Sequence, residues 1–229
     1  MSAAPRSGSS PIRRLIAPLV VVAVEAALLA LGLGSIEALR DPRAITLLAL
    51  SAAGGYALQL MQPMRGHDAT TSEPDAGPMV VLLLAPLFAP MVGALGARLG
   101  WAMLPSPMIV SWASLSLVGV GLLVRIAAIA QLGPRFSPIV AVQRNHALET
   151  RGLYSRIRHP GYLGALLACL GASLAFGSAL ALPLVLAMRI AHAARIRREE
   201  ALLARHFGEA WGAYVARTGS LLPRFGPTH

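Results

Sequence analysis

Four long apolar segments, each close to the length of a membrane-crossing helix, constrain this chain more than any other feature. They run over residues 15–39, 44–64, 79–104 and 107–132. A transmembrane helix needs about 20 consecutive apolar residues, and the breaks between the segments carry the proline and charged residues that stop helices. The sequence therefore predicts an all-α integral membrane protein, with four ordinary transmembrane helices in an N-terminal part that covers residues 1–131.

Composition and charge agree with a membrane location and exclude other classes. Of the 229 residues, 55% are hydrophobic, and the mean hydropathy of +0.63 is too high for an ordinary soluble enzyme. All 20 basic residues are arginine, which excludes lysine-based Schiff-base or P-loop chemistry. Long uncharged runs separate the arginines that give the net charge of +10, so we expect no nucleic-acid partner. The single cysteine, Cys169, lies in an apolar run, and the histidines lack metal-ligand spacing, so we expect neither a disulfide nor a metal site.

A fifth apolar stretch, residues 160–188, contains no charged residue. As one helix it would extend about 44 Å at 1.5 Å per residue, which is too long for one upright span, yet it is too short for two full spans and a turn. We expect a broken helical hairpin, hinged near residues 176–178 or at Pro183; the alternative is one long tilted helix. Interrupted membrane segments occur where protein or a cavity satisfies the freed backbone groups, which makes this stretch a candidate functional element.

The positions of the arginines predict the orientation of the chain, because positive charge is retained on the cytoplasmic side of a membrane. Arginines gather in the N-terminal segment, in the connection 133–159 and in the C-terminal region. Four spans followed by a hairpin place all three on one side. We therefore expect all three in the cytoplasm, with the protein embedded in the cell or inner membrane. The connection 65–78 falls on the same side although it is acidic, but acidic residues influence orientation little.

The C-terminal region becomes amphipathic and predicts a C-terminal amphipathic helix. Apolar side chains recur over residues 189–217 with the spacing of one helical stripe, namely Ile196, Leu203, Phe207, Trp211 and Tyr214. At about 100° per residue, Glu200 falls inside this stripe, where an unpaired carboxylate carries a heavy desolvation cost. Two interpretations follow: Glu200 forms a structural ion pair with an arginine, or it is a functional buried acid whose partner is an arginine.

The connection into the fifth apolar stretch combines features of a ligand site. Two glycines permit close backbone approach, a proline can begin a helix at its first position, and three rings offer flat polar surfaces. An arginine can clamp a carboxylate or phosphate in bidentate fashion. In chain order these residues are Gly152, Tyr154, Arg158, His159, Pro160, Tyr162 and Gly164.

Two motifs stand out in this part of the chain. The first reads Gly152-x-Tyr154 followed by Arg158-His159-Pro160-x-Tyr162-x-Gly164, and the second reads Glu199-Glu200-x-x-Leu203-x-x-x-Phe207-Gly208-x-x-Trp211-x-x-Tyr214. Together they resemble the isoprenylcysteine carboxyl methyltransferase and phospholipid methyltransferase superfamily, a group of integral membrane enzymes. The resemblance covers about residues 132–223 and implies that residues 132–229 form a catalytic region. Leu153 and Trp211 depart from the proline and tyrosine that the family often has there, which leaves the subfamily open.

Carried over position by position, the resemblance implies a site for S-adenosylmethionine. The implied cofactor contacts are Tyr154, His159, Pro160, Tyr162, Gly164, Glu199 and Glu200, and the implied catalytic residues are Arg158 and Glu200. Arg158 would orient the acceptor. A carboxylate acceptor is already ionised near neutral pH and needs no base, whereas an amine or a phenol requires a glutamate to take a proton.

The resulting hypothesis is an S-adenosylmethionine-dependent methyltransferase whose lipophilic acceptor enters from the bilayer. A prenylated cysteine is the family's best-known acceptor, while an isoprenoid, a phenolic lipid or a phospholipid headgroup stays open, as does the oligomeric state. One alternative is an NADPH-dependent reductase of the sterol type, although such enzymes tend to have Asn and an acid where this chain has Gly161 and Ala165. Another is a non-catalytic membrane protein, which would leave Glu200 without a role.

Overall fold

The computed structural model describes residues 11–61, 69–72, 76–133, 141–143 and 148–224. Its α-helices are α1 (Pro11–Leu33), α2 (Pro42–Met61), α3 (Ala76–Leu99), α4 (Pro107–Leu132), α5 (Pro160–Leu174), α6 (Leu182–Phe207) and α7 (Glu209–Arg217). The chain also contains the short 3-10 helices η1 (Glu37–Arg40) and η4 (Gly152–Ser155) and the strands β1 (Ala69–Ser72) and β2 (Ala141–Gln143).

The helices α1 to α4 are long and apolar enough to cross a membrane. Their apolar windows contain 18 to 26 residues with mean hydropathies between 1.5 and 2.4, and only 17 to 33% of each window is buried inside the protein. Large apolar side chains such as Leu19, Leu83 and Leu123 are exposed on them. Contiguous surfaces of this kind are unfavourable in water and suit lipid chains. The prediction of an integral membrane protein with four ordinary transmembrane helices is confirmed.

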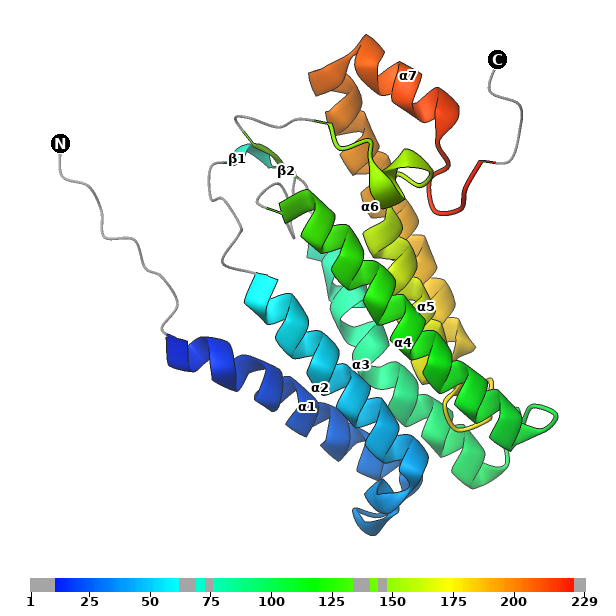
Figure 1. Ribbon diagram of the computed structural model, residues 1–229. Coiled ribbons are helices and arrows are strands. Elements are labelled where there is room, and N and C mark those ends of the chain that lie inside the picture. The colour runs from blue at the N-terminus through cyan, green and yellow to red at the C-terminus, as the bar shows by residue number, and fades with distance from the viewer. Residues whose placement is uncertain (1–10, 62–68, 73–75, 134–140, 144–147, 225–229) are drawn as a thin grey trace.

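The membrane helices alternate in direction, so their connections gather at two ends of the bundle (Figure 1). At one end, here called the turn end, the α3–α4 turn meets the α5–α6 turn, where the Ala179 N–H donates to the Ala102 carbonyl at 2.8 Å. At the other end, here called the site end, lie η4, the strands and α7 (Figure 1). The hairpin of α5 and α6 thus returns the chain to the site end, as its predicted topology requires.

The strands β1 and β2 form a short antiparallel pair, which the prediction of an all-α chain did not include. One strand lies in the α2–α3 connection and the other in the α4–α5 connection. The pairing therefore places these two connections at the same end of the bundle, as the parity of four spans predicts. The acidic residues Asp68, Glu73 and Asp75 and the N-terminal Arg6 lie outside the described residues.

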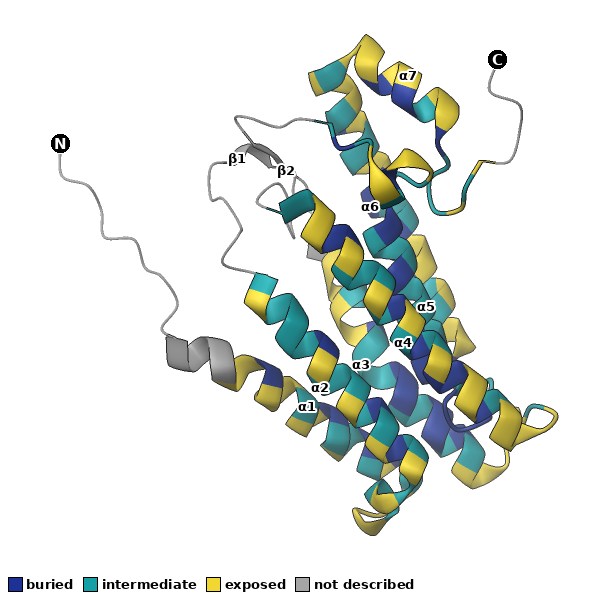
Figure 2. Cartoon of the chain, viewed as in Figure 1, coloured by how far each residue is buried: buried dark blue, intermediate teal, exposed yellow. Residues whose placement is uncertain are grey.

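The main core lies toward the turn end, where Leu29, Leu47 and Phe176 are almost completely buried. Figure 2 shows buried residues on the inner faces of the helices and exposed ones on their outer faces. The helices α4 and α5 approach closely because glycines face the neighbouring backbone. A Cβ atom at Gly164, for example, would lie 2.5 Å from the Gly121 carbonyl oxygen. Such contacts between small residues are typical of packed membrane helices.

The fifth apolar stretch forms the predicted hairpin, and the alternative of one long tilted helix is wrong. The helix α5 ends at Leu174 and α6 begins at Leu182. Gly177 in the turn has a φ of +77°, which favours glycine, and Pro183 lies in the first turn of α6, where its missing N–H costs nothing. The break therefore falls at both of the predicted signals.

The predicted amphipathic helix over 189–217 is divided in the structure. The second arm of the hairpin continues without a break to Phe207, so the arm and the first part of the amphipathic segment are one helix, α6. Gly208 then adopts a φ of 53° and ends α6, and α7 follows at an angle. Glycine adopts a positive φ readily because it has no Cβ atom. Trp211 and Tyr214 are buried on α7 and do not extend the stripe of α6.

Candidate functional site

The segment before α5 is fixed at the site end by backbone pairing with the residues that follow α7. The Arg158 N–H donates to the Gly219 carbonyl at 2.8 Å, and the Gly219 N–H donates to the Arg156 carbonyl at 3.0 Å. The His159 N–H donates to the Ser220 carbonyl at 3.0 Å. These hydrogen bonds engage the backbone N–H groups of Arg158 and His159, directly before α5. Because the backbone is held there, the direction of both side chains is set.

The centre of the candidate site is a three-residue cluster that joins the two sequence motifs. The Arg158 Nε donates to Glu200 Oε1 at 2.9 Å, and His159 Nε2 lies 3.0 Å from the same oxygen. The Arg158 Nη1 also donates to the Thr218 carbonyl. The arginine side chain is 10% exposed and the histidine side chain 4%. His159 occupies the N-cap position of α5 but makes no side-chain capping bond, because its ring is directed to Glu200.

The charge of Glu200 is maintained by this cluster. Burial raises the pKa of the carboxyl group, but the hydrogen bonds and positive charge from His159 and Arg158 outweigh burial, so that the pKa of Glu200 lies below its ordinary value of 4.5. The carboxylate is therefore ionised near neutral pH. Both interpretations drawn from the sequence give Glu200 an arginine partner, and that partner is Arg158.

A second chain of contacts runs beside the first. The Tyr162 hydroxyl donates to Glu199 Oε2 at 2.7 Å and accepts a hydrogen bond from Arg195 Nε at 2.8 Å. Arg195 is only 4% exposed. Sequence reasoning did not select Arg195, because it lies in an arginine-rich segment that resembles a solvated face. Arg195 lies four residues before Glu199 and so on the same side of the helix, and this spacing could have indicated that Arg195 belongs to the site.

Three rings line up between α5 and α6. The ring of Tyr162 lies 5.5 Å from that of His159 in a stacked arrangement and 4.9 Å from that of His192 in a tilted one. His192 is 2% exposed, and its Nδ1 has no hydrogen-bond partner within the described part of the chain. His192 was considered only as a possible metal ligand, because no motif includes it, so this second ring beside Tyr162 was not predicted.

The remaining predicted site residues lie in the scaffold around the cluster. The Tyr154 hydroxyl donates to the Ala128 carbonyl on α4 at 3.3 Å, and burial raises the pKa of that hydroxyl. Pro160 is buried in the first turn of α5, and Gly164 faces the backbone of α4. The structure thus brings Arg158, His159, Tyr162, Glu199 and Glu200 together, while Tyr154 and Gly164 contact α4 and Pro160 begins α5.

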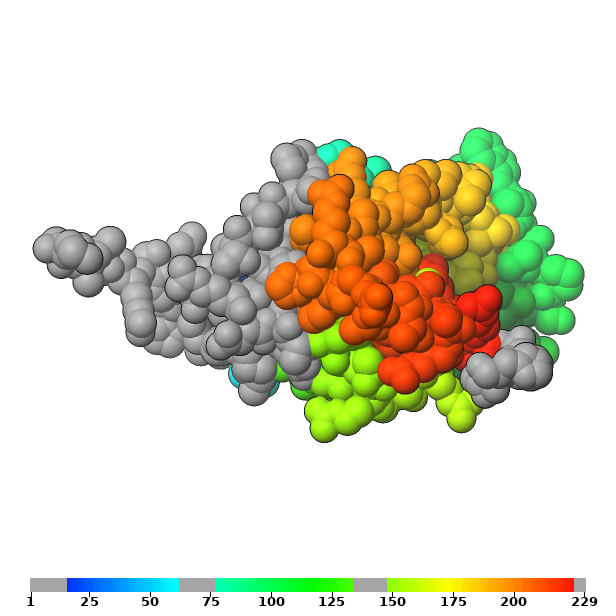
Figure 3. Space-filling model, turned by 90° about the horizontal axis from the view of Figure 1, so that it is seen from above, coloured from blue at the N-terminus to red at the C-terminus, as the bar shows by residue number. Residues whose placement is uncertain are grey.

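The cluster has the hydrogen-bond acceptors and ring faces that a cationic cofactor requires. Two carboxylates attract positive charge, and two adjacent rings offer faces for a cation–π contact. Glu200 is 26% exposed at its side chain, so the cluster reaches the surface. The upper face of the molecule at this point is formed by α6, α7 and the segment around η4 (Figure 3). These residues fit S-adenosylmethionine, which carries an ammonium, a sulfonium and an aromatic base.

A family model matches the region that holds both motifs. Residues 114–205 match the model described as the isoprenylcysteine carboxyl methyltransferase (ICMT) family. The match runs from α4 to the glutamates of α6. The resemblance that the motifs indicate is confirmed over this range.

Curated relatives match a similar share of the chain. A protein-S-isoprenylcysteine O-methyltransferase of Schizosaccharomyces pombe is 36% identical over 115 residues, which are 48% of this chain and 48% of the relative. A probable protein-S-isoprenylcysteine O-methyltransferase of Oryza sativa subsp. japonica is 30% identical over 117 residues, which are 50% of this chain and 61% of the relative. The alignments therefore span about half the length of the curated relatives.

A solved structure, that of the eukaryotic intramembrane Ras methyltransferase ICMT, aligns over 94% of this chain and 87% of that chain. The sequence identity is 20% and the TM-score is 0.48.

Proposed function

We propose that this chain is a membrane-embedded methyltransferase that transfers a methyl group from S-adenosylmethionine to a lipophilic acceptor. The observation that carries the proposal is the direct pairing of the two motifs, in which Arg158 and His159 contact Glu200 at 2.9 and 3.0 Å. The family match over residues 114–205 includes all three residues. The curated relatives that match are named as methyltransferases.

We assign cofactor binding to the carboxylates and rings of the cluster. S-adenosylmethionine supplies an electrophilic methyl group on a positively charged sulfur. Glu199 and Glu200 provide the negative charge that attracts such a ligand, and the rings of Tyr162 and His159 provide flat contact surfaces. Tyr154 and Gly164, which the resemblance also implicates, contact α4, and Pro160 begins α5, the helix that carries the ring of Tyr162.

Arg158 is assigned the role of orienting the acceptor. Its Nε and Nη1 are engaged by Glu200 and Thr218, while no described residue accepts a hydrogen bond from Nη2. The free N–H groups can donate to an incoming carboxylate, and the guanidinium group supplies charge and directional hydrogen bonds. Methyl transfer to an oxygen is an in-line displacement, so alignment of the acceptor is the main demand on the protein.

The electrostatics of Glu200 favour a carboxylate acceptor. A general base is most effective when its pKa lies near the working pH, and the pKa of Glu200 is below 4.5 because Arg158 and His159 stabilise the anion. Glu200 is therefore poorly suited to deprotonate an amine or a phenol. A carboxylate acceptor needs no such step, so we assign O-methylation of a carboxylate and give Glu200 the role of fixing Arg158.

A prenylated cysteine is the acceptor class that we propose first. The matching relatives are named for O-methylation of isoprenylcysteine, and an isoprenyl chain can reach the site from the bilayer that surrounds α1 to α4. We place the site end in the cytoplasm, where the cofactor is available, because exposed arginines gather there, including Arg156, Arg197 and Arg217.

The two alternatives drawn from the sequence gain no support. The matching family and the relatives named above are methyltransferases rather than nicotinamide reductases.

The test is ligand binding and methyl transfer by the detergent-purified full chain. Calorimetry with S-adenosylhomocysteine and, separately, NADPH identifies the cofactor, and transfer of a labelled methyl group to a short S-farnesylcysteine derivative identifies the acceptor. We expect binding of S-adenosylhomocysteine to weaken about tenfold or more in Glu200→Gln, which corresponds to the loss of one charge-assisted contact.

Arg158→Lys separates the two proposed roles. Lysine keeps the charge but loses the planar fork, so we expect methyl transfer to fall about tenfold or more while S-adenosylhomocysteine binding changes by less than about threefold. Arg156→Lys, an exposed neighbour, is the matched control. Binding of NADPH alone would overturn the methyltransferase assignment, and binding of neither ligand would favour a non-catalytic protein.

A further inference from the structure

The residue that ends α7 contacts Arg158 through its side chain as well as through its backbone. The Arg158 Nη1 donates to the Thr218 carbonyl and, at 3.4 Å, to the Thr218 hydroxyl. Thr218 is the C-cap of α7, lies in an extended conformation and is only 1% exposed. Two of the oxygens that hold Arg158 therefore belong to one buried residue.

The hydroxyl of Thr218 is itself held in one direction. It donates to the Tyr214 carbonyl, four residues earlier in the chain, at 2.6 Å. Because a hydroxyl has only one hydrogen to donate, its lone pairs are left to accept from the Arg158 Nη1. The Tyr214 hydroxyl donates in turn to the Tyr154 carbonyl of η4 at 2.7 Å. The helix α7 is thus fixed to η4 and presents the oxygens of Thr218 to the arginine.

The contacts of Arg158 determine which of its N–H groups remain for a ligand. Glu200 accepts from Nε, and Thr218 accepts from Nη1. A guanidinium group is planar and rigid, so contacts at two of its nitrogens also fix the direction of the third, Nη2. No described residue accepts a hydrogen bond from Nη2. Loss of either partner would let the plane turn and would change the direction of Nη2.

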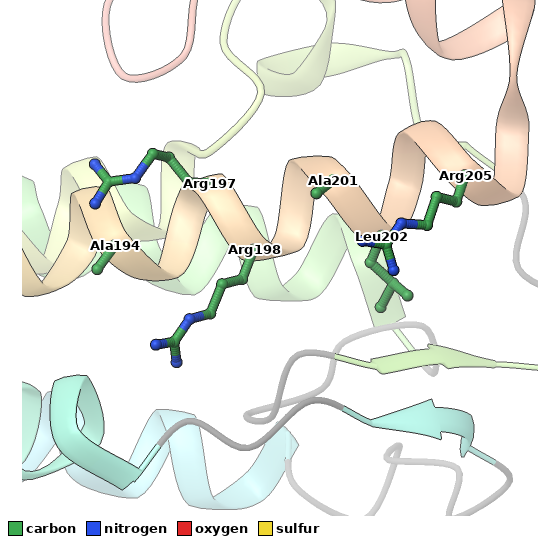
Figure 4. A pocket seen from close by; sticks show the side chains of 6 residues that line it. All are labelled: Ala194, Arg197, Arg198, Ala201, Leu202 and Arg205. Atoms are coloured by element: carbon green, nitrogen blue, oxygen red, sulfur yellow. The ribbon is translucent and has the colours of Figure 1, made fainter.

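The arginines that line a pocket along α6 do not duplicate this arrangement. The lining residues of that pocket are Ala194, Arg197, Arg198, Ala201, Leu202 and Arg205. In Figure 4, Arg198 and Arg205 extend from α6 to the side on which α3 and the two strands lie. At about 100° per residue, Glu200 projects about 160° away from Arg198 and about 140° away from Arg205. These two arginines therefore face away from Glu200 and cannot take over the role of Arg158.

We propose that Thr218 is a positioning residue of the methyl-transfer site, which directs the Arg158 guanidinium group toward the carboxylate of the acceptor. The proposal rests on the proposed methyl transfer and extends its machinery beyond the residues 114–205 that the family model matches. Displacement of a reacting group by about 1 Å can cost about a hundredfold in rate, so the direction of the arginine matters. Thr218 acts through Arg158 and not on a reacting atom.

The test compares Thr218→Val with Thr218→Ser in methyl transfer by the detergent-purified full chain to a short S-farnesylcysteine derivative. Valine resembles threonine in shape but lacks the hydroxyl, whereas serine keeps it. We expect the KM of the acceptor to rise about tenfold in Thr218→Val and to stay within about threefold of the wild type in Thr218→Ser. We expect the KM of S-adenosylmethionine and the binding of S-adenosylhomocysteine to change by less than about threefold in both variants.

The two KM values separate a positioning role from a structural one. A variant that folds less well has fewer active molecules, which lowers kcat but leaves the KM of both substrates unchanged. Thr46→Val is the matched control, because the Thr46 hydroxyl also donates to a carbonyl four residues earlier, that of Pro42, at 2.7 Å. Thr46 lies in α2, at the turn end. We expect both KM values of Thr46→Val to stay within about threefold of the wild type.

Tyr214→Phe tests the same arrangement if Thr218→Val does not fold, because it removes only the hydroxyl that fixes α7 to η4. We expect its acceptor KM to rise about threefold or more. The positioning role is overturned by an unchanged acceptor KM in Thr218→Val, or in Tyr214→Phe where Thr218→Val does not fold. It is also overturned if serine does not restore the acceptor KM or if the KM of both substrates rises equally. A wild type that transfers no methyl group would overturn the proposed function itself, and the positioning role with it.

Discussion

Two buried histidines flank the same tyrosine ring and differ in how their nitrogens are satisfied. His159 has Glu200 as a partner at 3.0 Å, whereas the Nδ1 of His192 has no hydrogen-bond partner among the residues that the structure describes. A buried polar atom without a partner costs about 1–3 kcal/mol. The same ring type therefore contributes to stability in one position and opposes it in the other.

This difference predicts opposite effects of one substitution. His192→Phe keeps a ring beside Tyr162 and removes the unpartnered nitrogen, so we expect the free energy of unfolding to stay the same or to rise by about 1 kcal/mol. His159→Phe removes a nitrogen that contacts Glu200, and we expect a loss of about 1–3 kcal/mol. Thermal unfolding in detergent, without ligand, measures both. A destabilisation by His192→Phe as large as that of His159→Phe would contradict this account.

The depressed pKa of Glu200 predicts how stability varies with pH. Because the folded state holds the carboxylate more strongly than the unfolded state does, the stabilisation is present above the ordinary pKa of 4.5 and is lost as the pH falls below it. We expect the unfolding temperature of the wild type to drop more steeply below about pH 4.5 than that of Glu200→Gln, whose side chain does not titrate.

The comparison is made from pH 7 to pH 3 with Glu209→Gln as the control. Glu209 is exposed at the start of α7, so its removal leaves the cluster unchanged. Parallel curves for the wild type and Glu200→Gln would show that the ion pair with Arg158 does not contribute to stability.

At the scale of the elements, the site depends on the close packing of α5 on α4. Gly121, Gly164 and Gly171 bring the two backbones together, and α5 presents His159 and Tyr162 at its first turn. A Cβ atom at Gly171 would lie 2.8 Å from the Val118 nitrogen, a backbone atom that cannot move aside cheaply. Any separation of these helices also displaces the start of α5 from α6.

We therefore expect Gly171→Ala to be destabilising although alanine favours helices. Overpacking of a tight contact costs about 1–3 kcal/mol, and S-adenosylhomocysteine binding should weaken with it because the first turn of α5 shifts. Gly212→Ala in α7 is the control, since a Cβ atom there meets nothing within 4 Å and the helix gains about 1 kcal/mol from alanine. Unfolding temperature and ligand affinity are measured for both variants, and equal behaviour would refute the packing argument.

Some features of these elements could be predicted from the sequence and others could not. The hinge of the hairpin and the partnership of Glu200 with an arginine follow from length, glycine and proline signals and from one acid on an apolar stripe. The break at Gly208 was not predicted, because the apolar spacing of four and three residues continues across it and periodicity alone cannot detect a residue with a positive φ. The role of Arg195 depends on the Tyr162 hydroxyl, 33 residues away in sequence, which no local pattern reveals.

At the scale of the whole molecule, charge differs between the two ends of the bundle. The described arginines of the turn end are Arg40, Arg43 and Arg98, and Arg43 is paired with Asp41 at 2.6 Å. The site end carries Arg151, Arg156 and Arg158 around η4, the arginines between residues 195 and 205 of α6, and Arg217 of α7. Since positive charge is retained in the cytoplasm, we expect the site end to be cytoplasmic and the turn end to face the other side.

Labelling of single cysteines tests this orientation. Cys169 is buried and is the only cysteine, so Cys169→Ala provides a background for Ser35→Cys at the turn end and Ala213→Cys on α7, both at exposed positions. A membrane-impermeant maleimide added to intact cells should label the cysteine at 35 and should reach the one at 213 only after permeabilisation. The reverse pattern would place the Arg158 and Glu200 cluster on the far side of the membrane, away from cytoplasmic S-adenosylmethionine. It would then contradict the proposed methyl transfer as well as the orientation, because both require the cofactor to enter at the site end.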